Sequence, residues 1–484
     1  MEEFNIHFVA KQSVKGIAAL ISRTFLIQVL GVVTSIILTI FLTPEIFGVY
    51  FVVASIIVFL NYFQDIGLAA SLIQKKEELT KEDLQTTFAV QELLVLLLVI
   101  PSLIFSKQIA SFYKLDSDGW MLLVALLISF FLSSLRTIPT VLLERNLNFK
   151  KLVLPQIVES VLYNICLITF AVMGLGVKSF TIAILVRSVS GLIVLYCIQR
   201  WPIGISFHMH VFKKLVTFGI PFQTHSILAL VKDDLLTIYL GKVLSFQQMG
   251  YVGFAQRYAF LPLRLIMDNV IKVTFPSFSR LQEDREGLRI GVEKSLFLIS
   301  TCLFPTVVGM AMLSKFLIEI FPAYQKWEPA LISLYFFALN TIFSSLSTPL
   351  TNFLNAIGKV KITLYFMTFW TAATWILTFI LIRKIGYNGV AIGSFLVSIS
   401  SVFVIVIAKR YLNFSIVRPV MPQIIATLTM LLFLIITRES VVQNLFSLLL
   451  EVFLAGIIYL GTLFLFAQSE IISTVRFVRS VVKK

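Results

Sequence analysis

Four charged side chains recur along one otherwise apolar stretch of the sequence. Arg257, Arg264, Asp268 and Lys272 follow one another at spacings of seven, four and four residues, which places them on one face of an α-helix. Asp268 lies one turn from both Arg264 and Lys272 and can neutralise them, whereas Arg257 has no acidic residue within a turn. Because a guanidinium can chelate phosphate oxygens in a bidentate manner, Arg257 is our first candidate for binding an anionic group, with Arg264 beside it.

Three carboxylates lie in or near apolar stretches. Asp233 and Asp234 follow Lys232, and Asp65 lies near the end of an earlier stretch. Desolvation favours the protonated form of a carboxyl group, so each could carry a coupled proton or bind a cation such as sodium. The alternatives are a structural ion pair of Asp233 or Asp234 with Lys232 or Arg257, and a helix-end position for Asp65. For Asp65 we favour the helix end.

Arg23 lies about two turns into the first apolar stretch, about 10 Å at 1.5 Å per residue. A charge inside the membrane is costly, so its side chain must face a wet cavity, a partner or the lipid headgroups. Snorkelling of this side chain to the headgroups is the alternative to a place in a cavity.

Polar side chains form a stripe on a later apolar stretch. Asn340, Ser344 and Thr348 recur every four residues, near Pro349. Facing a cavity, the stripe could form hydrogen bonds to sugar hydroxyls. Small hydroxyl residues also hold membrane helices together, and this is the alternative role of the stripe.

The histidines and cysteines predict no metal centre. His208 and His210 lie in a polar loop with no third ligand near them in the sequence, and the three cysteines lie in apolar stretches without zinc-site spacing. We expect no metal and no cofactor, and coupling to protons or sodium stays open.

The elements that position these residues are membrane-spanning helices. Of the 484 residues, 58% are hydrophobic and only 13% are charged, and the mean hydropathy is +0.94, which excludes a soluble globular enzyme. We place fourteen apolar stretches of sufficient length. They cover residues 16–42, 46–73, 85–106, 119–143, 152–173, 180–199, 215–241, 247–276, 295–321, 329–357, 362–382, 389–408, 420–437 and 445–468.

The net charge of +15 has a topological explanation. In a soluble protein it would suggest nucleic acid, which we exclude as a partner here. With a cytoplasmic N-terminus, the Lys and Arg residues of the inside segments outnumber those of the outside segments by about three to one. The positive-inside rule therefore predicts that both termini are cytoplasmic. The basic tail after residue 468 is a candidate for lying on the inner leaflet, against the alternative of a solvated tail.

An internal repeat relates the two halves. Leu38–Leu42 is similar to Leu236–Leu240, and both are followed by a Gly-containing start of the next stretch, Phe47–Tyr50 and Met249–Val252. Six stretches separate the partners, so the repeat is parallel. We therefore predict an all-α polytopic membrane protein with two six-helix lobes and two C-terminal helices. The expected divisions are residues 1–200, 201–410 and 411–484.

Several segments resemble the polysaccharide transporters, the O-antigen and exopolysaccharide flippases of the multidrug/oligosaccharidyl-lipid/polysaccharide flippase superfamily. The resemblance covers roughly residues 15–410. The segments are Asp65–Ala70, Leu79–Leu84, Leu143–Lys150, Phe275–Gln282, Tyr324–Ala330 and Asn355–Gly358.

This resemblance implies two six-helix lobes around a central cavity that opens alternately to each side of the bacterial inner membrane. The implied substrate is an oligosaccharide linked through pyrophosphate to a polyprenol, and membrane lipid and polysaccharide polymerase machinery are the implied partners. Spans 1, 2, 7 and 8 line the cavity in the family, which makes Arg23 and Arg257 candidates for binding the pyrophosphate together. A peptidoglycan-precursor flippase or a multidrug exporter is the alternative within the superfamily.

A membrane enzyme, such as a polysaccharide polymerase or ligase, is the alternative from another class. Such reactions need acid–base or metal-binding side chains, usually on a long extracytoplasmic loop. The longest predicted outside loop, residues 106–118, holds no His and only Asp116 and Asp118 as acids. We therefore predict a transporter that performs no chemistry on the sugar.

Overall fold

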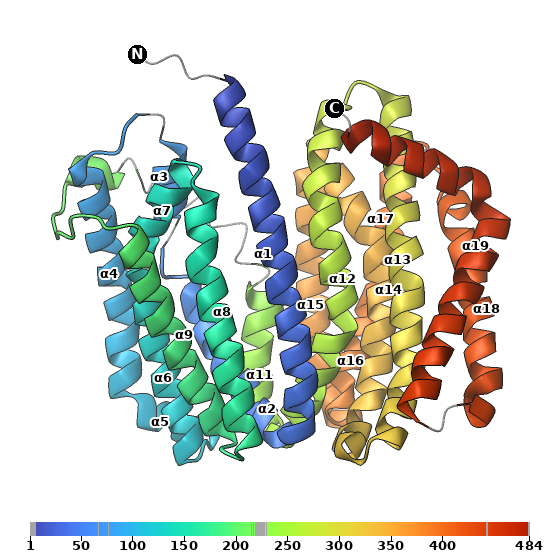
Figure 1. Cartoon of the computed structure of the whole chain (residues 1–484), viewed down its shortest axis with the longest axis horizontal. Coiled ribbons are helices and arrows are strands. Elements are labelled where there is room, and N and C mark those ends of the chain that lie inside the picture. The colour runs from blue at the N-terminus through green and yellow to red at the C-terminus, as the bar shows by residue number, and fades with distance from the viewer. Residues whose placement is uncertain are drawn as a thin grey trace. The chain divides into compact units, whose positions relative to one another are not determined.

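The computed structural model describes residues 6–482 except 66, 76, 214, 216, 218–227, 229 and 442–443 (Figure 1). Side chains are described for the same residues except 6–21, 268–269, 272–273, 438–441, 445 and 474–482. Within this part of the chain the regular structure is helical, without a strand. The prediction of an all-α polytopic protein is confirmed.

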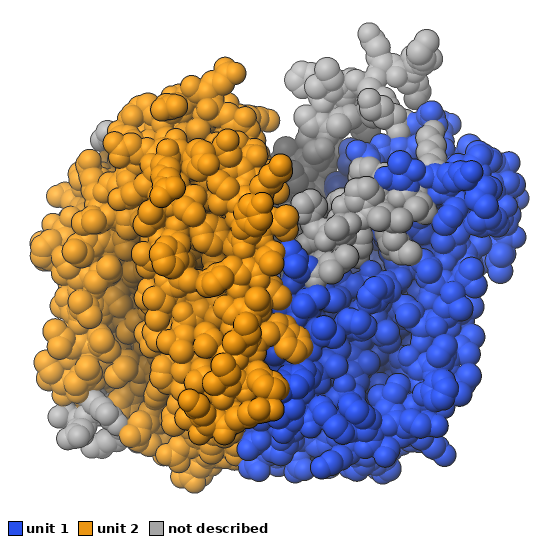
Figure 2. Space-filling view, turned by 180° about the vertical axis from the view of Figure 1, so that it is seen from behind, with its two compact units in different colours: residues 1–250 blue, residues 251–484 orange. Residues whose placement is uncertain are grey.

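Residues 1–250 form the first of two compact units, coloured separately in Figure 2. In this unit α8 packs against both α1 and α9, and α6 packs against α2, α4 and α9. Its helices are α1 (Ile6–Phe41), α2 (Pro44–Asn61), α3 (Leu68–Gln74), α4 (Lys81–Ile104), α5 (Ser106–Tyr113), α6 (Ser117–Ser134), α7 (Thr137–Arg145), α8 (Phe149–Val172), α9 (Val177–Ile198), the π-helix η1 (Leu230–Asp234) and α11 (Leu235–Val243).

Residues 251–484 form the second unit, which contains most of α12 (Phe246–Arg280). Here α14 packs against α13, α16 and α17, and α18 packs against α13 and α19. The other helices are α13 (Arg285–Ile320), the 3-10 helix η2 (Pro322–Ala330), α14 (Leu331–Ala356), α15 (Val360–Ile385), α16 (Asn388–Ile399), α17 (Ser401–Tyr411), α18 (Val417–Val441) and α19 (Leu445–Val482). Helix α19 bends at Ala467, where the backbone leaves helical geometry (Figure 1).

Twelve helices in the described part of the chain are long and apolar enough to cross a membrane. They correspond to twelve of the fourteen predicted stretches, all but the seventh and eighth. Twelve of the 27 residues of the seventh, 216, 218–227 and 229, lie outside the description. The eighth is α12, whose 35 residues are long enough to span but carry several charges. The exposed side chains of the spanning helices include many large apolar ones, such as Leu97 and Leu465, as lipid contact requires.

The contact-based division falls at Gly250, later in the chain than the division we expected at residue 200. The reason is local packing, because α11 and η1 contact α2 and α11 also contacts α5. This segment of the predicted seventh span therefore belongs to the first unit by its contacts.

Candidate functional site

Helix α12 buries one face and carries exposed arginines on another. Ala255 and Ala259 are fully buried, and the Thr341 hydroxyl of α14 donates to the Ala259 carbonyl at 3.1 Å. Phe254 stacks on Trp327 with ring centroids 4.3 Å apart. Small residues at the contact allow the close approach that membrane helices use. This face binds α12 to the second unit.

Arg257 and Arg264 lie on the other face of α12, and both side chains are exposed. Seven residues correspond to about 10 Å along the helix axis, so the two arginines lie about two turns apart on the same side of α12. Among the side chains that the structure describes, neither arginine forms an ion pair. The side chains of Asp268 and Lys272 lie outside the description, so the predicted neutralisation of Arg264 stays a prediction.

Arg23 is tied to a neighbouring helix of the first unit. One guanidinium nitrogen donates to the side-chain oxygen of Gln156 on α8, and the other donates to the Thr24 hydroxyl at 3.1 Å. The buried Nε has no hydrogen-bond partner among the described residues. Arg23 therefore contacts a partner, one of the three environments that suit a charge in an apolar stretch.

The acidic pair of the predicted seventh span lies in the π-helix η1. Asp233 forms an ion pair with Lys232 at 3.7 Å, and its side chain is exposed. Asp234 is partly exposed at the junction with α11. The ion pair of Asp233 with Lys232 is one of the structural pairs that the sequence leaves open. Single π-helical turns are rare and frequently occur at functional sites.

Asp65 lies at a helix end. Its carboxylate accepts a hydrogen bond at 2.9 Å from the backbone N–H of Ala69, in the first turn of α3. Burial raises the pKa of Asp65, while this hydrogen bond acts in the opposite direction. The position at a helix end is the one we favoured.

The polar stripe of α14 contacts α16 through Asn340. The buried Asn340 amide donates to the carbonyl and the hydroxyl of Ser394 on α16, at 2.8 and 2.9 Å. Ser344 donates to the Asn340 side chain at 3.1 Å, and Thr348 donates to the Ser344 carbonyl at 2.7 Å. The bonds of Asn340 to Ser394 are the interhelical contacts that we weighed against sugar binding, whereas Ser344 and Thr348 form their bonds within α14.

An ion pair between a partly buried arginine and a buried glutamate joins the start of α7 to α8 in the first unit. Arg136, at the start of α7, contacts Glu159 of α8 at 2.6 Å. Gly191 of α9 leaves room for the pair, because a Cβ there would lie 2.2 Å from the Glu159 carboxylate. These two charges of the first unit are thus paired with each other.

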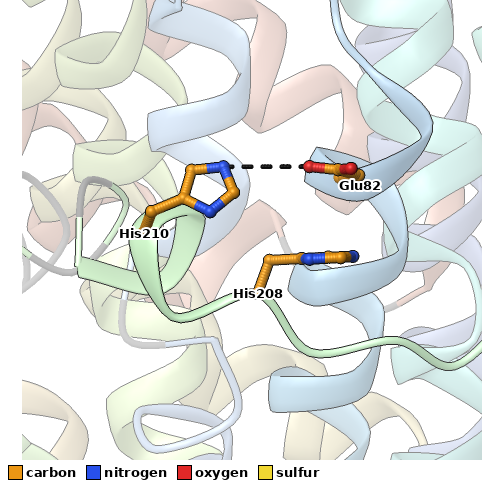
Figure 3. Close-up of side chains that lie close together, drawn as sticks. All are labelled: Glu82, His208 and His210. Carbon is orange, nitrogen blue, oxygen red and sulfur yellow. Dashed lines mark ion pairs between the residues drawn. The ribbon is translucent and has the colours of Figure 1, made fainter.

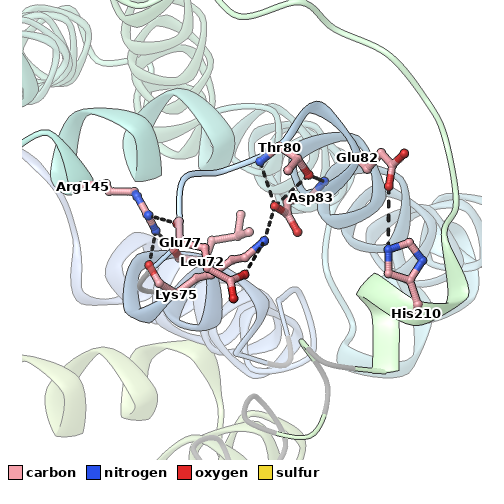
Figure 4. Close-up of polar contacts among 8 residues, drawn as sticks. All are labelled: Leu72, Lys75, Glu77, Thr80, Glu82, Asp83, Arg145 and His210. Atoms are coloured by element: carbon pink, nitrogen blue, oxygen red, sulfur yellow. Dashed lines mark hydrogen bonds and ion pairs between the residues drawn. The ribbon is translucent and has the colours of Figure 1, made fainter. Parts of the chain in front are cut away.

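Where α3, α4 and α7 meet, polar contacts fix the start of α4 (Figure 4). Lys75 forms an ion pair with Asp83 at 2.5 Å, and Thr80 and Asp83 form a capping box. Arg145 donates to the backbone carbonyls of Leu72 and Lys75 at 2.9 and 2.6 Å. The first turn of α4 is therefore held rigidly.

Glu82 in that first turn lies next to His208 and His210 (Figure 3). Our expectation that no third ligand lies near the two histidines is therefore wrong. Sequence reasoning missed Glu82 because more than a hundred residues separate it from the histidines, and only the path of the chain across α4 brings them together.

Comparison with known proteins identifies a family and several similar proteins. The sequence matches a family described as polysaccharide biosynthesis protein over residues 37–332. An uncharacterized membrane protein in the cps region of Klebsiella pneumoniae is 25% identical over 356 residues, 72% of either chain. The succinoglycan biosynthesis transport protein ExoT of Rhizobium meliloti is 24% identical over 285 residues, 58% of this chain and 57% of its own.

Among solved structures, the lipid II flippase MurJ in an inward closed conformation superposes with a TM-score of 0.74 at 18% identity. The match covers 94% of this chain and all of that one. This likeness establishes the fold, that of a polytopic helical membrane protein.

Proposed function

The chain belongs to the polysaccharide biosynthesis protein family, and we propose that it is a flippase for lipid-linked oligosaccharide. It would move a polyprenyl-pyrophosphate-linked oligosaccharide across the bacterial inner membrane by alternating access, for the synthesis of a surface polysaccharide. Its N- and C-termini would be cytoplasmic, and the product would pass to polysaccharide polymerase machinery. The name of the relative ExoT, a transport protein for succinoglycan biosynthesis, supports a transporter.

The observation that carries this proposal is the pair of exposed arginines, Arg257 and Arg264, on α12. Two guanidinium groups without an ion pair among the described residues stand on a helix whose length suits a membrane span. Such charges cost at least about 2.5 kcal/mol each at mid-bilayer unless they meet water or a counter-charge. A pyrophosphate head group supplies that counter-charge, and Arg257 would bind its oxygens in a bidentate manner with Arg264 beside it.

The two repeats would form lobes of residues 1–200 and 201–410, with residues 411–484 appended. The lipid head group would cross the membrane as the cavity between the lobes opens first to one side and then to the other. Movement of the lipid requires no cofactor. If transport is coupled to protons or sodium, the exposed Asp233 and its neighbour Asp234 are the carboxylates best placed to carry the ion, since Asp65 serves α3. Arg23 would act through its contact with α8 and would not bind substrate in this conformation.

The test is complementation of a flippase-null strain. We expect Arg257→Ala to abolish surface polysaccharide at unchanged protein abundance, with lipid-linked oligosaccharide accumulating on the cytoplasmic leaflet. Arg257→Lys should recover only part of the activity, because an ammonium group cannot chelate two oxygens. Arg187→Ala is the matched control, since that exposed arginine lies over the Tyr163 ring in the first unit. Wild-type polysaccharide in the Arg257→Ala strain would contradict the assignment.

The same strains separate the alternatives. A peptidoglycan-precursor flippase would rescue cells depleted of their own lipid II flippase, and a multidrug exporter would change drug susceptibility on deletion. A polymerase or ligase would transfer sugar in the purified state. We expect none of these three outcomes.

A further inference from the structure

Glu82, His208 and His210 form a compact group at the surface of the first unit. One ligand atom from each side chain lies within 4.8 Å of the others, and His210 Nε2 lies 3.8 Å from a Glu82 carboxylate oxygen (Figure 3). Transport of a lipid head group gives these residues no role. They are nevertheless two imidazoles and one carboxylate gathered from two separate segments of the chain.

Two imidazole nitrogens and a carboxylate oxygen are a ligand set that suits Zn²⁺. Bonds of about 2.0–2.1 Å in a tetrahedral site place neighbouring ligand atoms about 3.3 Å apart. The distances between the three ligand atoms must therefore shorten by about 1.5 Å at most when a metal binds. The Glu82 and His210 side chains are 53% and 74% exposed, so rotation about their own side-chain bonds can supply this movement. The fourth position would stay open to water.

The backbones that carry the ligands are fixed before any metal binds. Glu82 follows the capping box of Thr80 and Asp83. The segment that carries the histidines is bonded to α4. The Ser206 hydroxyl donates to the Gln85 side chain at 3.0 Å, and the His208 N–H donates to the Thr86 hydroxyl at 3.2 Å.

The segment before the histidines is held on α4 as well. The Trp201 ring meets Phe88 edge to face at 5.1 Å. A Cβ on Gly204 would lie 2.0 Å from the Gln85 amide, so the chain runs in close contact with α4. A site whose backbone is already positioned loses little conformational entropy when it binds its ion.

We propose that Glu82, His208 and His210 bind one divalent transition-metal ion, with Zn²⁺ as the matching ion. The ion fastens residues 208–210, in the segment that follows α9, to the first turn of α4. This metal is structural and is separate from substrate binding, so the proposal stands whether or not the flippase assignment does.

The experiment uses the full chain in detergent, purified without a polyhistidine tag and stripped with a chelator. Titration with Co²⁺ should give visible absorption bands of a tetrahedral site that saturate near one equivalent, and Zn²⁺ should displace the Co²⁺. His210→Asn and Glu82→Gln should each weaken Zn²⁺ binding, measured by calorimetry, at least about tenfold, since even outer-shell losses cost 10–100-fold.

His7→Asn is the control, because it removes a histidine elsewhere in the sequence, and it should bind Zn²⁺ as the wild type does. Size-exclusion profiles and metal-free melting temperatures establish that the His210→Asn and Glu82→Gln variants are folded. Absence of saturable binding in the wild type, or unchanged affinity in folded His210→Asn, would overturn the proposal.

Discussion

Gly48 and Gly250 take equivalent places in a reciprocal contact between the two sequence repeats. A Cβ on Gly48 would lie 1.8 Å from the carbonyl oxygen of Phe246, and a Cβ on Gly250 would lie 1.8 Å from the carbonyl oxygen of Pro44. Gly48 stands four residues after Pro44, as Gly250 does after Phe246, so the start of α2 and the start of α12 cross with local two-fold symmetry. The repeat seen in the sequence is thus also a packing contact.

Gly48→Ala should therefore destabilise the protein strongly. The new methyl group meets backbone, which cannot rotate away, and we expect a loss of about 3 kcal/mol or more, or failure to fold. Melting temperature in detergent and the yield of monodisperse protein measure this. Gly31→Ala is the matched helical control, because nothing lies within 4 Å of its Cβ position, and it should be neutral or stabilising. Equal melting temperatures for the two variants would contradict the close contact.

The Arg136–Glu159 pair should show the asymmetry of buried charges. Arg136→Met leaves Glu159 uncompensated inside the helix bundle, and we expect about 3–5 kcal/mol of destabilisation. The double variant Arg136→Met/Glu159→Met should recover most of that loss because no charge stays behind. Lys178→Met, which breaks the more exposed pair with Asp118 at 3.5 Å, should cost under about 1 kcal/mol. A double variant as unstable as Arg136→Met would refute this account.

Asn340→Ala should reduce stability while transport continues. The amide loses two hydrogen bonds to Ser394 across α14 and α16, worth about 1–3 kcal/mol together. Arg257→Ala should show the opposite result, with an unchanged melting temperature and lost transport. Thermal unfolding and the amount of surface polysaccharide are measured for both variants. Together they distinguish a residue that packs helices from one that binds substrate. Lost transport at wild-type stability in Asn340→Ala would instead place the stripe at the substrate.

Asp65 can be tested by separating its charge from its hydrogen bond. Burial raises the pKa of Asp65, so the ionised carboxylate is less favourable in the folded protein than in the unfolded chain. The stability of the protein is therefore full below the unfolded-state pKa and falls as pH rises through the folded-state pKa. At neutral pH Asp65→Asn should therefore be as stable as the wild type or more so, because the amide oxygen still accepts from Ala69. Asp65→Ala should lose about 1 kcal/mol with that acceptor.

Transport distinguishes the two roles of Asp65. The Asp65→Asn variant should produce wild-type surface polysaccharide if the residue only serves the start of α3. Abolished polysaccharide at wild-type stability would make Asp65 an ion-coupling group.

Local pattern made much of this protein predictable. Hydropathy over about twenty residues located twelve spans that the structure contains, since a helix in lipid satisfies its backbone hydrogen bonds by itself and must be apolar outside. The all-α polytopic class followed directly. The candidate arginines of α12 also followed, because helical spacing alone decides that Arg257 and Arg264 share a face.

What the sequence by itself determined were thus the helices, their apolar surfaces and the faces on which charges stand. Only the tertiary structure decided partners: Gln156 for Arg23, Glu159 for Arg136, and Glu82 for the two histidines. These contacts join segments 133, 23 and more than a hundred residues apart. Periodicity and hydropathy describe each helix against its solvent, whereas the choice of partner depends on how separate helices pack against one another in space.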